Sequence, residues 1–204
     1  MITNNAMEGA YSVMISATAN TVFANNLVRA NSGTTSSAVS CVSGTPSIRN
    51  NVILGNEGAG IGVSDGSPTI TGNLVVENAI GIVVNSGSPI IAYNDVVDNT
   101  TADYSGQARD DVGGISQDPE FVDAAAGDYH LLSTSPCIDA GWPGSVYADP
   151  DGSRNDIGMY GGPYAALWIP PYTGPVVTSL EVTPSTVPQG GIITVRATGT
   201  TLRN

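Results

Sequence analysis

The sequence contains no lysine, and all six of its basic residues are arginine. Charged residues make up only 12% of the chain and aromatic residues 6%. No stretch approaches the ~20 consecutive apolar residues that a membrane-spanning helix needs. The 18 aspartates and glutamates give a formal net charge of -12, which repels phosphate backbones and anionic lipid surfaces. We therefore expect no nucleic-acid partner and no membrane insertion.

Two further features are scarce, namely targeting signals and cysteine. The N-terminus lacks a basic stretch followed by an apolar core, so no signal peptide is visible, and we expect any targeting segment to lie upstream in a longer protein. Cys41 and Cys137 lie 96 residues apart, a spacing that fits no metal motif. A disulfide between them remains an alternative, but two buried free thiols are favoured.

What the sequence does contain is an internal repeat built around asparagine. An aliphatic or aromatic residue recurs three positions before an Asn, with spacings of 21, 25, 22 and 21 residues. The repeats are Ile2–Asn5, Phe23–Asn26, Ile48–Asn51, Ile70–Asn73 and Ile91–Asn94. A second Asn follows five residues later in four repeats, at Asn31, Asn56, Asn78 and Asn99.

The columns of this repeat have the periodicity of β-strands. Two residues after the first Asn stand Val28, Ile53, Val75 and Val96. Charge occurs on either side of this column but never in it, so we expect it to point inward. Further inward pairs, spaced by two residues, are Val39 and Cys41, Ile61 and Val63, and Ile82 and Val84. Short strands that repeat every 21 to 25 residues predict coils that stack through parallel strands and bury a shared interior. We expect the recurring Asn to adopt the left-handed conformation at a bend and to hydrogen-bond from coil to coil.

These repeats resemble the right-handed parallel β-helix proteins of the pectate-lyase-like superfamily. The resemblance covers about residues 1–160 and implies an all-β fold with five or six coils. It is specific for the fold and not for an activity, because that superfamily includes lyases, hydrolases, epimerases, tailspikes and adhesins.

The period is lost after Asn99. Residues 1–100 are therefore interpreted as the β-helix coils, and residues 101–160 as irregular, acidic C-terminal coils and a cap. The sequence Asp156-Ile157-Gly158-Met159-Tyr160 is similar to the end of the closing segment of bacterial β-helix proteins. Residues 161–176 are interpreted as a Pro/Gly linker. Residues 177–204 alternate like two strands joined by a turn, and resemble the start of a bacterial immunoglobulin-like domain.

The best candidate ligand-binding group comes from the regular coils. Glu77 and Asp98 occupy the same position in adjacent repeats, with Asp95 and Tyr93 near them in sequence. Stacked carboxylates suit Ca²⁺ or acid–base work on a sugar. The alternative is a solvated acidic edge, which is favoured because no arginine lies beside them. No catalytic residue is assigned for the same reason.

A second candidate site is a metal site in the acidic segment. Asp149, Asp151 and Asp156 surround Gly152 and resemble a short calcium loop. A turn in which these side chains bond their own backbone explains the same residues equally well. Ca²⁺ is the only cofactor that the sequence suggests. His130, the single histidine, is expected to be structural because no Ser or Cys is placed to act with it.

Three functions remain open. The preferred one is a non-catalytic, extracellular or cell-surface module of a larger bacterial protein, either glycan-binding or a rigid spacer. The second is a fragment of a polysaccharide lyase or glycoside hydrolase. The third is a self-assembling filament subunit, joined through its first coil and its C-terminal strands. The expected partners are accordingly a polysaccharide or cell-surface glycan, or further copies of the chain.

Overall fold

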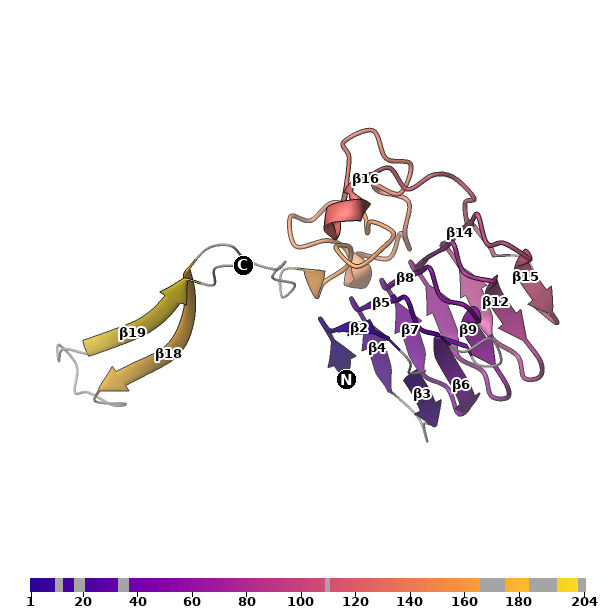
Figure 1. Cartoon of the computed structure of the whole chain (residues 1–204), viewed down its shortest axis with the longest axis horizontal. Coiled ribbons are helices and arrows are strands. Elements are labelled where there is room, and N and C mark those ends of the chain that lie inside the picture. Colours follow the sequence, from indigo (N-terminus) through magenta and orange to yellow (C-terminus); the bar gives the residue numbers. More distant parts are fainter. Residues whose placement is uncertain are drawn as a thin grey trace. The chain divides into compact units, whose positions relative to one another are not determined.

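The computed structural model describes residues 1–9, 13–16, 21–32, 37–108, 111–165, 175–183 and 194–201. The chain divides into two compact units, Met1–Trp168 and Ile169–Asn204. The first unit contains a right-handed parallel β-solenoid whose three sheets each hold five strands, one from each coil (Figure 1). The all-β, parallel β-helix prediction is confirmed.

The strands follow one another in the same order in every coil. The first sheet contains β1 (Ile2–Thr3), β4 (Val22–Ala24), β7 (Ser47–Arg49), β10 (Thr69–Thr71) and β13 (Ile90–Ala92). The second contains β2 (Ala6–Glu8), β5 (Leu27–Arg29), β8 (Val52–Leu54), β11 (Leu74–Val76) and β14 (Asp95–Val97). The third contains β3 (Val13–Ser16), β6 (Val39–Ser43), β9 (Ala59–Val63), β12 (Ile80–Val84) and β15 (Ala102–Gly106).

The predicted inward column forms one file through the interior. Val28, Ile53, Val75 and Val96 are register partners in adjacent strands, and each is 0% exposed. The second set of inward positions is also correct, with Val39 opposite Ile61 and Cys41 opposite Val63. Burial of these branched side chains stabilises the stack, at about 1.5–3 kcal/mol for each fully buried side chain.

The bends between the strands use the left-handed conformation, but one residue earlier than predicted. In the turn after the first sheet, the residues with positive φ are Asn4, Asn25, Asn50, Gly72 and Tyr93. In the turn after the second sheet they are Gly9, Ala30, Gly55, Glu77 and Asp98. The recurring Asn that follows each of these residues except Gly9 instead forms side-chain hydrogen bonds with the adjacent coils.

The residues that follow form two ladders of side-chain amides. In the first ladder, Nδ2 of Asn26 donates to Oδ1 of Asn51 over 3.0 Å, and Asn51 donates to Asn73 over 2.8 Å. The second ladder repeats this geometry through Asn31, Asn56, Asn78 and Asn99. Members of the ladders also donate to main-chain carbonyls, as Asn51 does to Phe23. The side-chain amides are buried at the coil corners, and these bonds give them the hydrogen-bond partners that they would otherwise lack.

Each ladder ends on a carboxylate. Nδ2 of Asn94 donates to Oδ2 of Asp111 over 2.9 Å, and Nδ2 of Asn99 donates to Oδ1 of Asp103 over 2.9 Å. An ionised carboxylate only accepts hydrogen bonds, so it pairs with the last donor of a ladder and offers no donor of its own.

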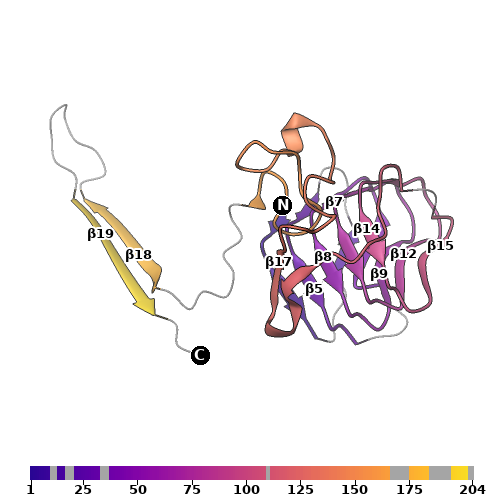
Figure 2. The same cartoon turned by 90° about the horizontal axis from the view of Figure 1, so that it is seen from above.

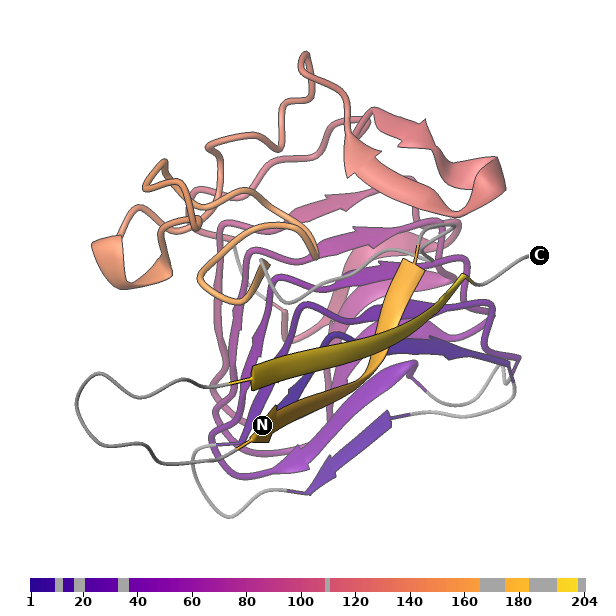
Figure 3. The same cartoon turned by 90° about the vertical axis from the view of Figure 1, so that its left-hand side faces the viewer.

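Residues 101–160 were expected to form irregular C-terminal coils and a cap that closes the stack. We call residues 111–165 the side segment, and its start lies against the last coil through isolated parallel bridges from Val112 to Ala92 and from Ile115 to Asp95. The rest runs along the outside of the coils (Figures 1 and 3). It contains a hairpin of β16 (Phe121–Asp123) and β17 (Asp128–Leu131), with η1 (Ala124–Ala126) between them, and η2 (Ser145–Tyr147).

The side segment buries outward-facing apolar residues of the coils in a second core. This core contains the buried residues Leu27, Val52, Leu74, Val76, Tyr129, Cys137, Ile157 and Met159. Figure 2 shows the segment beside the coils in the perpendicular view. The outward strand positions next to the inner file are therefore dry, although they lie on the outside of the solenoid.

The second unit contains a two-stranded antiparallel hairpin of β18 (Pro175–Thr183) and β19 (Thr194–Thr201). The predicted pair of strands is therefore confirmed. Most of the predicted linker, residues 166–174, lies outside the described residues, and the likeness to an immunoglobulin-like domain stays a prediction.

Candidate functional site

Glu77 and Asp98 occupy equivalent turn positions in adjacent coils, as predicted. They directly follow the register partners Val76 and Val97, and both are exposed. Their positive φ values of 57° and 55° mark the corner between the second and third sheets. The side chains are thus available to solvent, and ligand binding by this pair stays a prediction.

The structure separates Asp95 from that pair. Asp95 begins β14 and is 0% exposed. Its Oδ1 accepts a hydrogen bond from the main-chain N–H of Gln117 over 3.1 Å, and its Oδ2 accepts one from Sγ of Cys137 over 3.2 Å. Burial raises the pKa of Asp95 to about 6, which the two hydrogen bonds only partly oppose. Asp95 therefore anchors the side segment and does not face a ligand together with Glu77 and Asp98.

Both cysteines are free and buried, as favoured from the sequence. Cys137 donates its thiol hydrogen to Asp95, and burial raises its pKa. Cys41 lies in the inner file of the third sheet and is 0% exposed. Thiols with raised pKa values in dry surroundings are poor nucleophiles, so both are structural.

Tyr93 belongs to a different surface, a cluster of four aromatic rings and two arginines. We call this the aromatic–arginine cluster, and its members are Tyr93, Trp142, Tyr147, Tyr164, Arg49 and Arg154. The Tyr93 and Trp142 rings meet edge to face, with centroids 5.2 Å apart, and the Trp142 and Tyr147 centroids are 6.1 Å apart. All four rings are half-buried, so each keeps part of its surface in contact with solvent.

Arg49 enters the cluster from the end of β7. Its register neighbours Ala24 and Thr71 are small, which leaves room above the sheet for the rings of the side segment. The Arg49 guanidinium carbon lies 5.2 Å from the ring centroids of both Tyr147 and Tyr164. Within the described residues, its Nε is buried and has no hydrogen-bond acceptor, and the side chain has no carboxylate partner.

Arg154 borders the same cluster on its exposed side. Its Nε donates to the carbonyl of Gly141 over 2.8 Å, and its Nη2 donates to the carbonyl of Ala140 over 3.1 Å. Its guanidinium carbon lies 5.7 Å from the Tyr93 ring centroid. Arg154 therefore fixes the loop that carries Trp142 against Tyr93.

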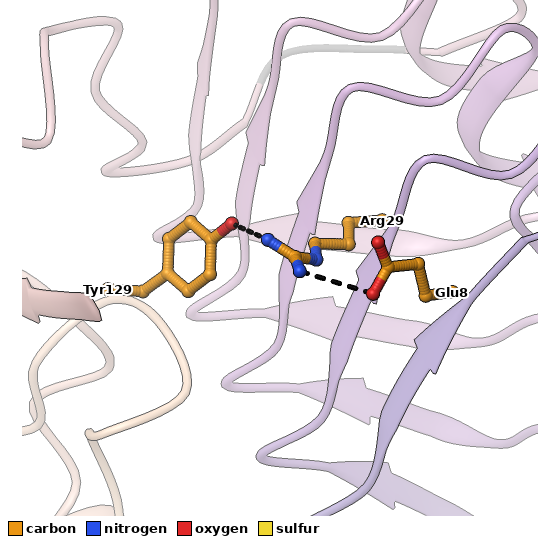
Figure 4. A network of polar contacts seen from close by, with 3 residues as sticks. All are labelled: Glu8, Arg29 and Tyr129. Carbon is orange, nitrogen blue, oxygen red and sulfur yellow. Dashed lines mark hydrogen bonds and ion pairs between the residues drawn. The ribbon is translucent and has the colours of Figure 1, made fainter. Parts of the chain in front are cut away.

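A third arginine connects the side segment to the first two coils. Nη1 of Arg29 donates to the hydroxyl of Tyr129 over 2.7 Å, and its Nη2 forms an ion pair with Oε2 of Glu8 over 3.1 Å (Figure 4). The Tyr129 ring packs edge to face on Phe121, with centroids 5.2 Å apart. This network ties the hairpin of the side segment to β2 and β5.

The predicted calcium residues lie in a turn of the side segment and bond mainly to main-chain groups. Asp149 accepts hydrogen bonds from the N–H groups of Asp156 and Gly162. Asp151 accepts from the N–H and hydroxyl of Ser153. Among the residues with described positions, no group of three or more His, Cys, Asp or Glu side chains is arranged to hold a metal ion. The hydrogen-bonded turn is thus what the structure contains, and Ca²⁺ binding by Asp149, Asp151 and Asp156 stays a prediction.

His130 has the structural surroundings that the sequence indicated. Its Nδ1 lies 2.6 Å from Oδ1 of Asp128, and its ring stacks on Tyr160 with centroids 3.8 Å apart. The hydrogen bond to His130 lowers the pKa of the Asp128 carboxyl.

The five-coil solenoid, with its buried file and amide ladders, defines a right-handed parallel β-helix protein. Residues 1–112 match the model of the NosD family, described as periplasmic copper-binding protein, and the chain belongs to this family. Neither a curated protein nor a solved structure matches the chain. A periplasmic or extracellular setting agrees with this family. The described part of the chain includes no helix of the length and apolarity that crossing a membrane requires.

The described residues do not fit a copper centre. Copper favours imidazole, thiolate and thioether ligands, and the matched region offers no histidine. Its one cysteine, Cys41, is buried in the core. The thiol of Cys41 lies near the carbonyl oxygens of Ser43 and Asp65, at 3.6 and 3.7 Å. Of the three methionines in the matched region, Met1 and Met14 are exposed and Met7 packs against the core, so the region offers thioethers without an imidazole or an accessible thiolate beside them.

The aromatic–arginine cluster was not predicted as a site. The sequence signal that could have indicated it is the concentration of tyrosine and tryptophan after residue 100. Arg49 and Tyr93 come from coils that are two repeats apart, so only the stacking of the coils brings them toward the same face.

Proposed function

We propose that the chain is a rigid, non-catalytic module of a periplasmic or extracellular protein, and that it holds neighbouring parts of that protein at a fixed separation. The observation that carries this proposal is the pair of amide ladders, which run through adjacent coils without a break. A hydrogen bond of this kind contributes about 0.5–1.5 kcal/mol net, and an unpaired buried amide costs more. Sliding of one coil over the next therefore breaks several favourable contacts at once.

The side segment adds a second restraint against bending. It is held to the last strands by Asp95 and Cys137, and to the first strands by Arg29, Glu8 and Tyr129. A single piece of chain thus bridges both ends of the stack on one side. This arrangement supports a structural role more directly than a catalytic one.

Distance measurement between spin labels tests the rigidity. Met14 and Ser105 lie on the same outward column of the third sheet, four strand spacings apart. At ~4.8 Å per spacing, their separation is roughly 19 Å. We expect the doubly labelled variant M14C/S105C to give one narrow distance distribution, while the native thiols stay unlabelled because they are buried. A broad distribution would contradict the spacer role.

The singly labelled variant M14C is the matched control. It detects dipolar coupling between molecules, and a strong signal there would favour the self-assembling alternative. The non-catalytic part of the proposal is tested separately, by incubating the protein with polysaccharides and measuring reducing ends and unsaturated products. Release of either product would overturn it.

Glycan binding is a second candidate function, and the aromatic–arginine cluster is the observation that favours it. This binding is compatible with a spacer, because the cluster lies on the outside of the coils.

A further inference from the structure

We propose that the aromatic–arginine cluster is a binding site for a neutral glycan. The site consists of the partly exposed rings of Tyr93, Trp142, Tyr147 and Tyr164, with Arg49 between two of them and Arg154 at the edge. It is formed by a coil face together with the loop of the side segment that contains η2.

The rings supply the surfaces that sugars use for stacking. Tyr93, Trp142 and Tyr147 form a continuous row, with centroid separations of 5.2 and 6.1 Å and interplanar angles of 66° and 60°. Partly exposed tyrosine and tryptophan present an apolar body and a polar tip. The C–H face of a pyranose packs on such a body, and its hydroxyls remain free to form hydrogen bonds.

Arg49 supplies donors that the protein itself leaves unused. A guanidinium carries five N–H donors and no acceptor. In the described structure, Arg49 contacts the Tyr147 and Tyr164 rings, and its buried Nε has no acceptor. A buried donor without a partner costs about 1–3 kcal/mol. Sugar hydroxyls can accept hydrogen bonds from the remaining N–H groups of this half-buried side chain.

The charge of the surroundings points to a neutral sugar. The same segment carries Asp139, Asp149, Asp151 and Asp156, and the whole chain has a net charge of -12. A uronate polymer meets repulsion from these carboxylates as it approaches. A neutral glycan avoids this repulsion, and its hydroxyls donate to carboxylates as readily as they accept from arginine.

The experiment uses the single-tryptophan variant W168F, in which Trp142 is the only remaining indole. Neutral oligosaccharides (hexamers of β-glucose, xylose and mannose) and an oligogalacturonate are titrated in parallel at low and high salt. We expect at least one neutral hexamer to change the Trp142 emission with a saturable, salt-independent curve. Calorimetry on the unmodified chain then checks that the fluorophore variant has not created the binding.

The variant R49Q is expected to weaken that binding by about tenfold, the effect of losing one or two hydrogen bonds from a charged donor. The matched control is R196Q, which removes the same charge from β19 in the second unit, and we expect it to bind like the parent. A second variant, Y147L, removes one ring face and keeps a similar volume. Thermal melts of all variants confirm that they are folded.

Three results would overturn the proposal: no neutral hexamer binds, R49Q and Y147L bind as tightly as R196Q, or only the galacturonate binds and is released by salt. None of these results affects the spacer role, since that role depends on the distance between labels and not on a ligand.

Discussion

The coils and the side segment are held in place by hydrogen bonds that differ in the sequence separation of their partners. In the coils, the side-chain hydrogen bonds of the ladders join residues 21 to 25 positions apart, because every coil interacts with the next. The hydrogen bonds between the side segment and the coils join residues that are much farther apart in sequence. Arg29 and Tyr129 are separated by 100 positions, Asn50 and Asn155 by 105, and Asn25 and Met159 by 134.

This difference implies two levels of stability in one unit. The coils form a repeating array in which the contacts of one coil are reinforced by its neighbours. The side segment adheres through a few specific contacts and its own small core, and it is joined to the coils by a single stretch of chain. We expect it to open locally at a lower free energy than the coils unfold.

The largest effect is expected inside the coils. Replacing Ile53 with Ala leaves a cavity in the file of side chains and is expected to reduce the free energy of unfolding by about 2–5 kcal/mol. Chemical denaturation measures this change. The control is V146A in the side segment, where the side chain is 74% exposed and the expected change is below about 0.5 kcal/mol. Similar losses in the two variants would contradict the assignment of the core.

An effect of intermediate size is expected from pH. The pKa of Asp95 is about 6 in the folded chain and ~3.9 in an unfolded one. The fold therefore prefers the protonated carboxyl, and stability that is fully present below about pH 4 is lost as the pH rises to 6 and beyond. This loss amounts to about 3 kcal/mol for a shift of this size. The groups that face Asp95 are Cys137, Gln117, Asp103 and Asp118.

The variant D95N isolates this contribution. We expect its stability to fall less than that of the parent between pH 4 and 7, and to exceed the parent at pH 7, as measured by denaturation at each pH. D98N removes an exposed carboxylate from the same coil and serves as the control, with a pH profile like that of the parent. Burial also raises the pKa values of Asp111, Asp149 and Asp156, so part of the pH dependence persists in D95N. Parallel profiles for D95N and the parent would rule out Asp95 as the titrating group.

The smallest effect is expected at the far end of the side segment. R29Q removes the donor to Tyr129 and the charge that pairs with Glu8, and we expect a loss of about 1 kcal/mol. We expect this loss to appear as faster amide hydrogen exchange in β16 and β17, with little change in the melting temperature of the whole unit. E8Q removes only the ion pair of a largely exposed carboxylate, at less than about 0.5 kcal/mol. A large drop in the melting temperature of R29Q would mean that the segment and the coils unfold as one unit.

The coils were predictable because their contacts follow the repeat. The inward position of Val28 and Ile53 follows from a two-residue strand period combined with a spacing of 21 to 25 residues. The hydrogen bonds of the recurring Asn between coils were also predictable, but the residue that adopts the left-handed conformation was not. In the first turn of each coil, the preceding residue carries the positive φ, and its identity varies from Asn50 to Gly72 to Tyr93.

The side segment was predictable only as an irregular acidic stretch. Its position depends on individual partners such as Cys137 with Asp95, and the repeat, which ends at Asn99, does not extend to Cys137. The candidate group of Glu77, Asp98, Asp95 and Tyr93 failed to assemble for the same reason. Neighbours along one coil point to different faces, and Asp95 is covered by a segment whose path the repeat does not determine.

The carboxylates of Asp103 and Asp111 have one more consequence, for changes in the number of coils. Each ladder amide between the first and the last accepts a hydrogen bond from one neighbour and donates one to the next, so a duplicated coil inserted among the existing ones joins both ladders without any other substitution. A coil added beyond Asp103 and Asp111 meets carboxylates that accept hydrogen bonds and have none to donate. Growth of the repeat by duplication is therefore permitted within the array and blocked at this border, unless both aspartates change as well.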